Sequence, residues 1–136
     1  MMSKAIAKMR GMNADLAKKL IKQGISNSDQ LLALSRKPAD RKKLAKDIDI
    51  DVKEVLALAN RADLARITGI GAVFSDLLES AGVDTVKELA KRRSDNLHQT
   101  IGKVNEEKKL TSRIPTPAQV EGWVAQAKAL PKMLEY

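Results

Sequence analysis

A short segment in the middle of the chain has the residue types needed to bind an anion through its backbone. Residues 67–71 read Ile-Thr-Gly-Ile-Gly, with Ile70 between Gly69 and Gly71, and we call this segment the glycine turn. Glycine accepts positive φ and lets another backbone come close, so such a turn can direct free amide N–H groups toward a nucleic-acid phosphate. The same residues also suit a purely structural turn between two packed helices. Phosphate binding is the leading hypothesis, and the structural turn is its alternative.

Basic residues surround a related segment near the N-terminus. Arg10, Gly11 and Asn13 form a degenerate version of the glycine turn, in which asparagine replaces the second glycine. Asparagine tolerates left-handed backbone better than most residues, so this turn can persist. Cations that follow could neutralise phosphates, and this group consists of Lys18, Lys19, Lys22, Arg41, Lys42 and Lys43. A solvated helix face is the alternative interpretation of these charges.

The chain contains no recognisable combination of catalytic or metal-binding residues. It has no cysteine and a single histidine, His98, which argues against disulfides, thiolate metal sites and cysteine nucleophiles. Asp47, Asp49 and Asp51 alternate as in a calcium loop, but the glycine and glutamate that such a loop requires are absent. We therefore expect a protein without enzymatic activity, metal or cofactor.

The charge distribution favours a polyanionic partner. The 136 residues include 25 Lys/Arg and 17 Asp/Glu, which gives a net charge of +8. Residues 1–66 hold 15 basic and 8 acidic side chains, whereas residues 67–136 hold 10 and 9, so the basic surface belongs to the first half. No stretch is apolar over a membrane-spanning length, and the N-terminus does not resemble a signal peptide. We expect a cytoplasmic protein with no membrane contact.

The sequence is a degenerate repeat of one helical unit. A shift of 58 positions aligns eight apolar or glycine positions without a gap, including Gly24 with Gly82 and Leu20 with Leu78. We expect two units, residues 1–62 and 63–136, packed into one compact helical domain with a shared core. Only 2% of the residues are aromatic, and no segment alternates as a half-buried strand would. The predicted fold class is therefore all-α.

Capping signals place the individual helices. Thr116 before Pro117 predicts the start of a final helix over 118–130, with Trp123 as a core residue. Asp84 is predicted to cap a short helix over 86–90, and Ser94 a longer one that runs toward 109. The other expected helices cover 3–9, 14–23, 28–34, 38–46, 51–60 and 74–81.

The residues around the glycine turn also carry a family resemblance. They resemble a helix-hairpin-helix motif through Leu64, Ile67, Gly69, Ile70, Gly71, Ser75 and Leu78. The continuation over 81–90 resembles the RNA polymerase alpha C-terminal domain. A broader resemblance, to an uncharacterised bacterial family of unknown function, covers nearly the whole chain and is carried by 61–71, 96–98, 105–110 and 120–123. It implies a tandem helix-hairpin-helix fold and brings no established activity, cofactor or catalytic residue.

Two hypotheses about function follow. The first is a non-enzymatic protein that contacts duplex DNA through the sugar-phosphate backbone, without reading the base sequence. The glycine turn departs from a DNA-binding helix-hairpin-helix because no Lys or Arg stands in the helical turn after Gly71, whereas the segment around Asn13 has the charge but lacks the second glycine. The second hypothesis is a helical module that binds a protein partner or forms oligomers, with the turns serving only as scaffold.

Overall fold

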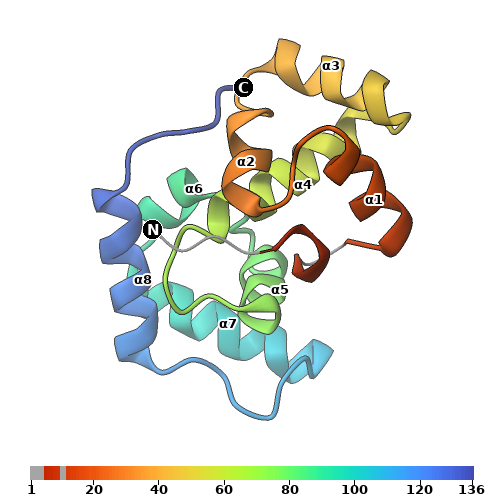
Figure 1. The fold of residues 1–136 in the computed structure, drawn as a ribbon. Helices are drawn as coiled ribbons and strands as arrows, with labels where there is room; N and C mark the ends of the chain where they lie inside the picture. The colour runs from red at the N-terminus through yellow and green to blue at the C-terminus, as the bar shows by residue number, and fades with distance from the viewer. Residues whose placement is uncertain (1–4, 10–11) are drawn as a thin grey trace. The chain divides into compact units, whose positions relative to one another are not determined.

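Helices are the only regular elements in the part of the chain that the structure describes, which confirms the predicted all-α fold class. The computed structural model describes residues 5–9 and 12–136, and no strand occurs within these ranges. Figure 1 shows the short 3-10 helix η1 and the α-helices. Their bounds are η1 Ile6–Lys8, α1 Ala14–Lys22, α2 Ser28–Ala33, α3 Pro38–Ile48, α4 Val52–Leu64, α5 Ala72–Ser80, α6 Val86–Ala90, α7 Ser94–Lys108 and α8 Pro117–Ala129.

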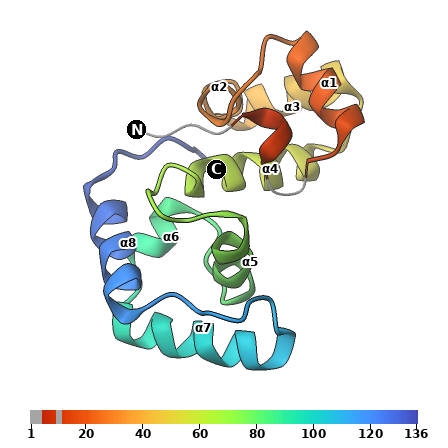
Figure 2. The ribbon, with the colours of Figure 1, turned by 60° about the horizontal axis from the view of Figure 1, so that its bottom comes forward.

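The helices form two compact units with the same internal plan. Unit 1 contains α1 to α4 and ends at Arg66, and it also includes Met133–Tyr136. Unit 2 is Ile67–Lys132 and contains α5 to α8. In each unit the first helix contacts the third, and the fourth contacts both the second and the third (Figure 2). The α-helices of the two units therefore contact one another in the same pairs, while η1 is an addition to unit 1.

The first helix of each unit also ends in the same way. Gly24 follows α1 with φ of +83°, and Gly82 follows α5 with φ of +91°. In unit 1 the amide of Ile25 donates to the carbonyl of Leu20 at 3.0 Å, and Val83 makes the same bond to Leu78 in unit 2 at 2.8 Å. Glycine is required because this C-terminal cap needs a left-handed residue.

Helix starts agree with the predicted capping signals in part. Thr116 caps α8 in a complete capping box with Gln119, as its Thr-Pro pair predicted. The prediction that Asp84 caps α6 is wrong, since Thr85 is the N-cap and its side chain accepts from the amide of Glu88. The prediction for Ser94 is also wrong. Serine is the first residue of α7, and the N-cap residue Arg93 makes no side-chain capping bond.

The core of unit 1 includes a residue from the end of the chain. Leu134 is buried in one cluster with apolar residues of η1, α1, α2, α3 and α4. Arg36 holds this segment through two hydrogen bonds. Its side-chain Nε donates to the carbonyl of Met133 at 3.0 Å, and its backbone carbonyl accepts from the amide of Glu135 at 2.8 Å. The sequence did not predict this contact, because nothing local marks two segments so far apart as partners.

The paired glycine caps yield a stability prediction. Gly24→Ala should lower the free energy of unfolding by about 1 kcal/mol, because alanine must adopt positive φ although nothing lies within 4 Å of its new Cβ. The control is Gly122→Ala inside α8, where the added Cβ also meets nothing within 4 Å. That change should raise the free energy of unfolding by about 0.5–1 kcal/mol, since alanine favours helix. Urea unfolding measures both, and equal effects of the same sign would contradict the assigned backbone geometry.

Candidate functional site

The glycine turn is a compact loop with a buried anchor. Ile67 and Ile70 are both buried, whereas Thr68, Gly69 and Gly71 are exposed. Gly69 has φ of +95°, which a residue with a side chain adopts only with strain. The amide of Ile70 donates to the carbonyl of Ile67 at 3.4 Å, so the loop closes over one turn. Exposed backbone thus alternates with apolar side chains that fix it in place.

Helix α8 holds the glycine turn from the side. Gln126 makes two hydrogen bonds to the backbone of Thr68, accepting from its amide at 2.9 Å and donating to its carbonyl at 3.2 Å. Trp123 packs against the next residue, where a Cβ added to Gly69 would lie 3.2 Å from the indole Nε1. The ring of Phe74 lies 5.4 Å from the ring of Trp123. These contacts fix the turn and confirm the prediction that Trp123 belongs to the core.

The start of α5 lacks a side-chain cap. Gly71 is its N-cap residue in extended backbone, with φ of −89° and ψ of −172°, and it has no side chain that could accept from the first-turn amides. Ala72 and Val73, the first two residues of α5, are exposed. A helix begins with amide groups that have no partner inside the helix, and these groups favour an anion. The geometry at this end of α5 is therefore suited to a phosphate oxygen.

The equivalent position in unit 1 is closed by its own side chain. Asn13 is the N-cap residue of α1, and its Oδ1 accepts from the amide of Leu16 at 2.8 Å. Its φ is −122°, so the asparagine does not use its tolerance of left-handed backbone and acts as a helix cap in extended backbone. Arg10 and Gly11, also predicted for this site, lie outside the described residues.

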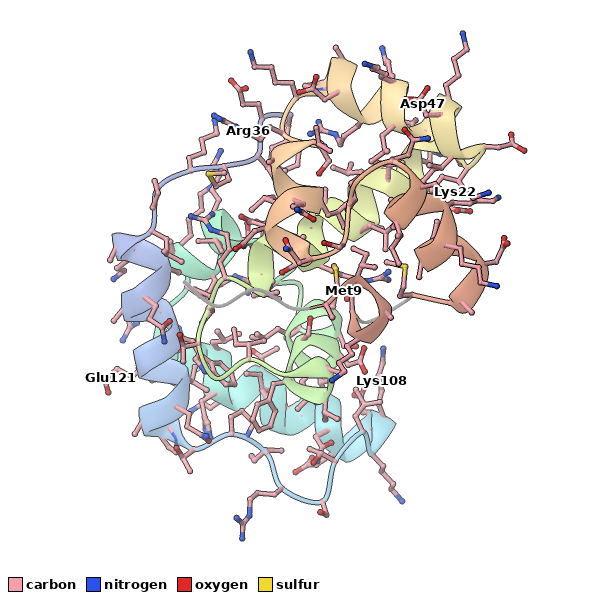
Figure 3. All side chains as sticks on the ribbon, viewed as in Figure 1. Met9, Lys22, Arg36, Asp47, Lys108 and Glu121 are labelled. Atoms are coloured by element: carbon pink, nitrogen blue, oxygen red, sulfur yellow. The ribbon has the colours of Figure 1, made fainter. Side chains whose placement is uncertain are left out.

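The predicted lysines of unit 1 lie on two helices that contact each other. Lys18 and Lys22 are exposed on α1, and Lys42 and Lys43 are exposed on α3 (Lys22 is labelled in Figure 3). Lys19 is half-buried, and its Nζ lies 3.7 Å from a carboxylate oxygen of Asp15 one turn earlier. Surface pairs of this kind are weak, so the contact with Asp15 does not prevent Lys19 from meeting a phosphate.

Arg41 is not an exposed cation, which corrects its predicted place in this group. It is buried, and its guanidinium donates to the carbonyls of Ser35, Arg36 and Glu135 at 2.7–3.0 Å. Its guanidinium carbon also lies 5.7 Å from the centre of the Tyr136 ring. Arg41 therefore joins the segment at the end of the chain to the α2–α3 turn, and it is not available to a phosphate.

A buried ion pair precedes the glycine turn, and the sequence reasoning missed it. Arg66 donates to a carboxylate oxygen of Asp63 at 2.9 Å, and both side chains are almost fully buried. The spacing of three residues at the end of α4 was the available signal. Breaking one partner of such a pair is costly because the other charge stays buried.

The described part of the chain offers neither a metal-binding cluster nor a membrane-spanning helix. Residues 5–9 and 12–136 contain no group of three or more side chains placed to hold a metal ion. Over the same ranges, every helix is too short or too polar to cross a lipid bilayer. The Nε2 of His98 lies 3.0 Å from the carbonyl oxygen of Pro115, which ties α7 to the segment before α8.

Residues 10–130 match a family described as Domain of unknown function (DUF4332), and the chain belongs to this family. The match covers both units from α1 to the end of α8. No curated protein and no solved structure shows significant similarity to the chain.

The contact between α8 and the glycine turn yields a second prediction. Gln126→Ala removes both hydrogen bonds to Thr68 and should lower the free energy of unfolding by about 1–2 kcal/mol, with faster amide hydrogen exchange at residues 68–71. Gln99→Ala on the exposed surface of α7 is the control, and it should change neither quantity measurably. Unchanged exchange at residues 68–71 in the Gln126 variant would show that the turn is held by other contacts.

Proposed function

We propose that this protein is a non-enzymatic nucleic-acid-binding protein that contacts the backbone of duplex DNA without reading base sequence. The observation that carries the proposal is the uncapped start of α5 beside a glycine turn that α8 holds in place. Amides fixed in advance bind an anion at a smaller entropic cost than amides of a loop that must first be ordered. On this proposal, the glycine turn acts as the hairpin of a helix-hairpin-helix motif.

The charges of unit 1 support the same proposal. Residues 1–66 hold 15 basic and 8 acidic side chains. Residues 133–136, which also belong to unit 1, add only the carboxylate of Glu135. The exposed lysines of α1 and α3 can attract a phosphate backbone and displace counterions from it. We infer that these lysines provide affinity, whereas the amides of Gly69, Gly71 and the first turn of α5 fix where a phosphate sits.

Neutralising two lysines tests the electrostatic part. Replacing Lys18 and Lys22 by Gln should weaken binding to a generic 20-base-pair duplex and lower the slope of log K against log salt by about 1.8, or about 0.9 for each lost phosphate contact. Fluorescence anisotropy at several salt concentrations measures both. Replacing Lys87 and Lys103, exposed lysines of unit 2, by Gln is the matched control with the same loss of charge.

The control separates a defined surface from net charge alone. An equal loss in the two double variants would contradict the role of α1, because net charge would then account for the binding. Wild-type protein that fails to bind duplex at low salt would overturn the proposal. Recovery of one stoichiometric protein partner after nuclease treatment would then favour the protein-interaction module.

The difference between the two units provides a sharper test of the amides. Gly71→Asn should reproduce the cap that Asn13 makes, since Gly71 has extended backbone and a Cβ added there meets nothing within 4 Å. The asparagine side chain would accept a hydrogen bond from an amide at the start of α5, and that amide could no longer bind a phosphate. DNA affinity should therefore fall about tenfold, a change of about 1.4 kcal/mol. The free energy of unfolding should stay equal or rise by a few tenths of a kcal/mol.

Gly71→Ala is the matched variant at the same position. Alanine adds a Cβ but no acceptor, so DNA affinity should be retained while the free energy of unfolding falls by about 1 kcal/mol. Loss of affinity in both variants would mean that the glycine itself is needed for close approach of a partner. Full affinity in the asparagine variant would show that the amides at the start of α5 do not bind DNA.

A further inference from the structure

A hollow in unit 2 lies apart from the glycine turn and differs from it in chemistry. It measures about 690 Å³ and is lined by the turn that joins α6 to α7 and by one face of α8. We call it the cationic groove, and its charged lining residues are Lys91, Arg92, Arg93, Asp95, Glu121 and Lys128. Figure 3 shows Glu121 projecting outward from α8.

The cationic groove and the glycine turn use different faces of α8. Glu121, Val124, Ala125 and Lys128 follow one another at intervals of three, one and three residues, which places them on one stripe of the helix. The residues that hold the glycine turn, Trp123 and Gln126, lie outside this stripe. A ligand in the groove would therefore not occupy the phosphate site proposed at the start of α5.

The entire positive charge excess of unit 2 gathers in this groove. Residues 67–132 contain 10 basic and 8 acidic side chains. The groove holds 4 of the basic and 2 of the acidic ones, which leaves 6 of each sign over the rest of the unit. A local excess of cations in a concave site attracts an anion even where the surrounding surface is neutral. The charge of the groove thus indicates the sign of its ligand.

The four cations of the groove differ in how strongly they are already bound to other groups of the protein. Arg92 is committed to the fold, since its guanidinium lies 3.1 Å from Glu88 and donates to the carbonyl of Gly82. Arg93 is largely exposed and pairs at 3.1 Å with Asp95, whose side chain is also mostly exposed, and solvent weakens such a contact. Lys91 and Lys128 are exposed, and neither forms an ion pair within the described part of the chain. Three cations are therefore available to a ligand.

The carboxylate of Asp95 competes for the same place. The amide of Asn96 donates to it at 2.8 Å, and this bond, with the nearby charge of Arg93, holds the pKa of Asp95 below its usual value. The side chain therefore stays ionised at neutral pH beside the start of α7. An anion that binds Arg93 must displace this carboxylate or tolerate its repulsion.

We propose that the cationic groove binds a compact phosphate-bearing small molecule. The volume is within the range of small-molecule sites, and the small side chains of Ala90 and Ala125 leave it unfilled. Arginine and lysine together match phosphate oxygens, because the guanidinium offers paired donors and the ammonium a compact charge. This site is separate from the proposed DNA contact and does not depend on it.

Titration with inorganic tripolyphosphate, in the absence of DNA, tests the groove. Isothermal calorimetry should show one site that weakens at least tenfold when Lys91 and Lys128 are both replaced by Gln. Ala125→Met fills the groove without changing charge and should also weaken binding at least fivefold. Asp95→Asn removes the competing carboxylate and should tighten binding about threefold to tenfold. The opposite effects of these neutralising changes distinguish a site from a structural role.

Matched variants outside the groove provide the controls. Replacing Lys87 and Lys103 by Gln, or Glu106 by Gln, should leave tripolyphosphate binding within twofold of wild type, and thermal unfolding should confirm that each variant is folded. The proposal is overturned by wild-type protein that does not bind tripolyphosphate, by equal losses in the control lysine variant, or by unchanged binding in Ala125→Met. A groove variant that loses only duplex binding would assign these cations to a nucleic-acid backbone instead.

Discussion

The contact of α8 with the glycine turn is the constraint on which the candidate site of unit 2 depends. Gln126 satisfies both backbone groups of Thr68, and Trp123 packs tightly against Gly69, where an added Cβ would lie 3.2 Å from the indole Nε1. An exposed loop normally gains order only at a cost in conformational entropy. Here α8 supplies that order. A complete capping box at Thr116 and a buried apolar stripe stabilise α8 independently of the turn. The amides after Gly71 are thereby held in place without a ligand.

The two units show how one helical plan can be given different surface chemistry. Asn13 and Gly71 are equivalent N-cap residues, both in extended backbone, yet the asparagine side chain binds an amide of its own helix and the glycine leaves the start of α5 uncapped. Net charge differs in the opposite sense, because the unit with the capped helix is the more basic one. Unit 1 has most of the excess positive charge, whereas the charged side chains of unit 2 balance outside the cationic groove. A DNA-binding helix-hairpin-helix was expected to combine free amides with nearby cations. Unit 2 has the free amides, and unit 1 has most of the cations.

Local signals in the sequence predicted the fold well, and non-local contacts explain what they missed. Gly82 and the Thr116-Pro117 pair fixed helix ends because capping depends on neighbouring residues. The predicted cap at Asp84 was wrong by one position. Aspartate and threonine can both cap a helix, and the residue at which α6 starts decides between these two neighbours. Arg41 shares the buried stripe of α3 with Leu44, Ala45 and Ile48, a periodicity that was visible. Its partner Glu135 lies 94 residues away and was not predictable, nor was Gln126, which lies 58 residues from Thr68.

The absence of basic residues in the first turn of α5 is compatible with the proposed phosphate site. Backbone amides at a helix start are fixed dipoles, and their attraction for an anion depends on orientation more than on the net charge around them. A lysine beside them would add long-range attraction but would also bind other anions and lose strength as salt rises. In the proposed function, the lysines of α1 and α3 carry the salt-dependent attraction, so the glycine turn needs only geometry. That geometry depends on contacts with Gln126 and Trp123, and these are neutral side chains that salt does not screen.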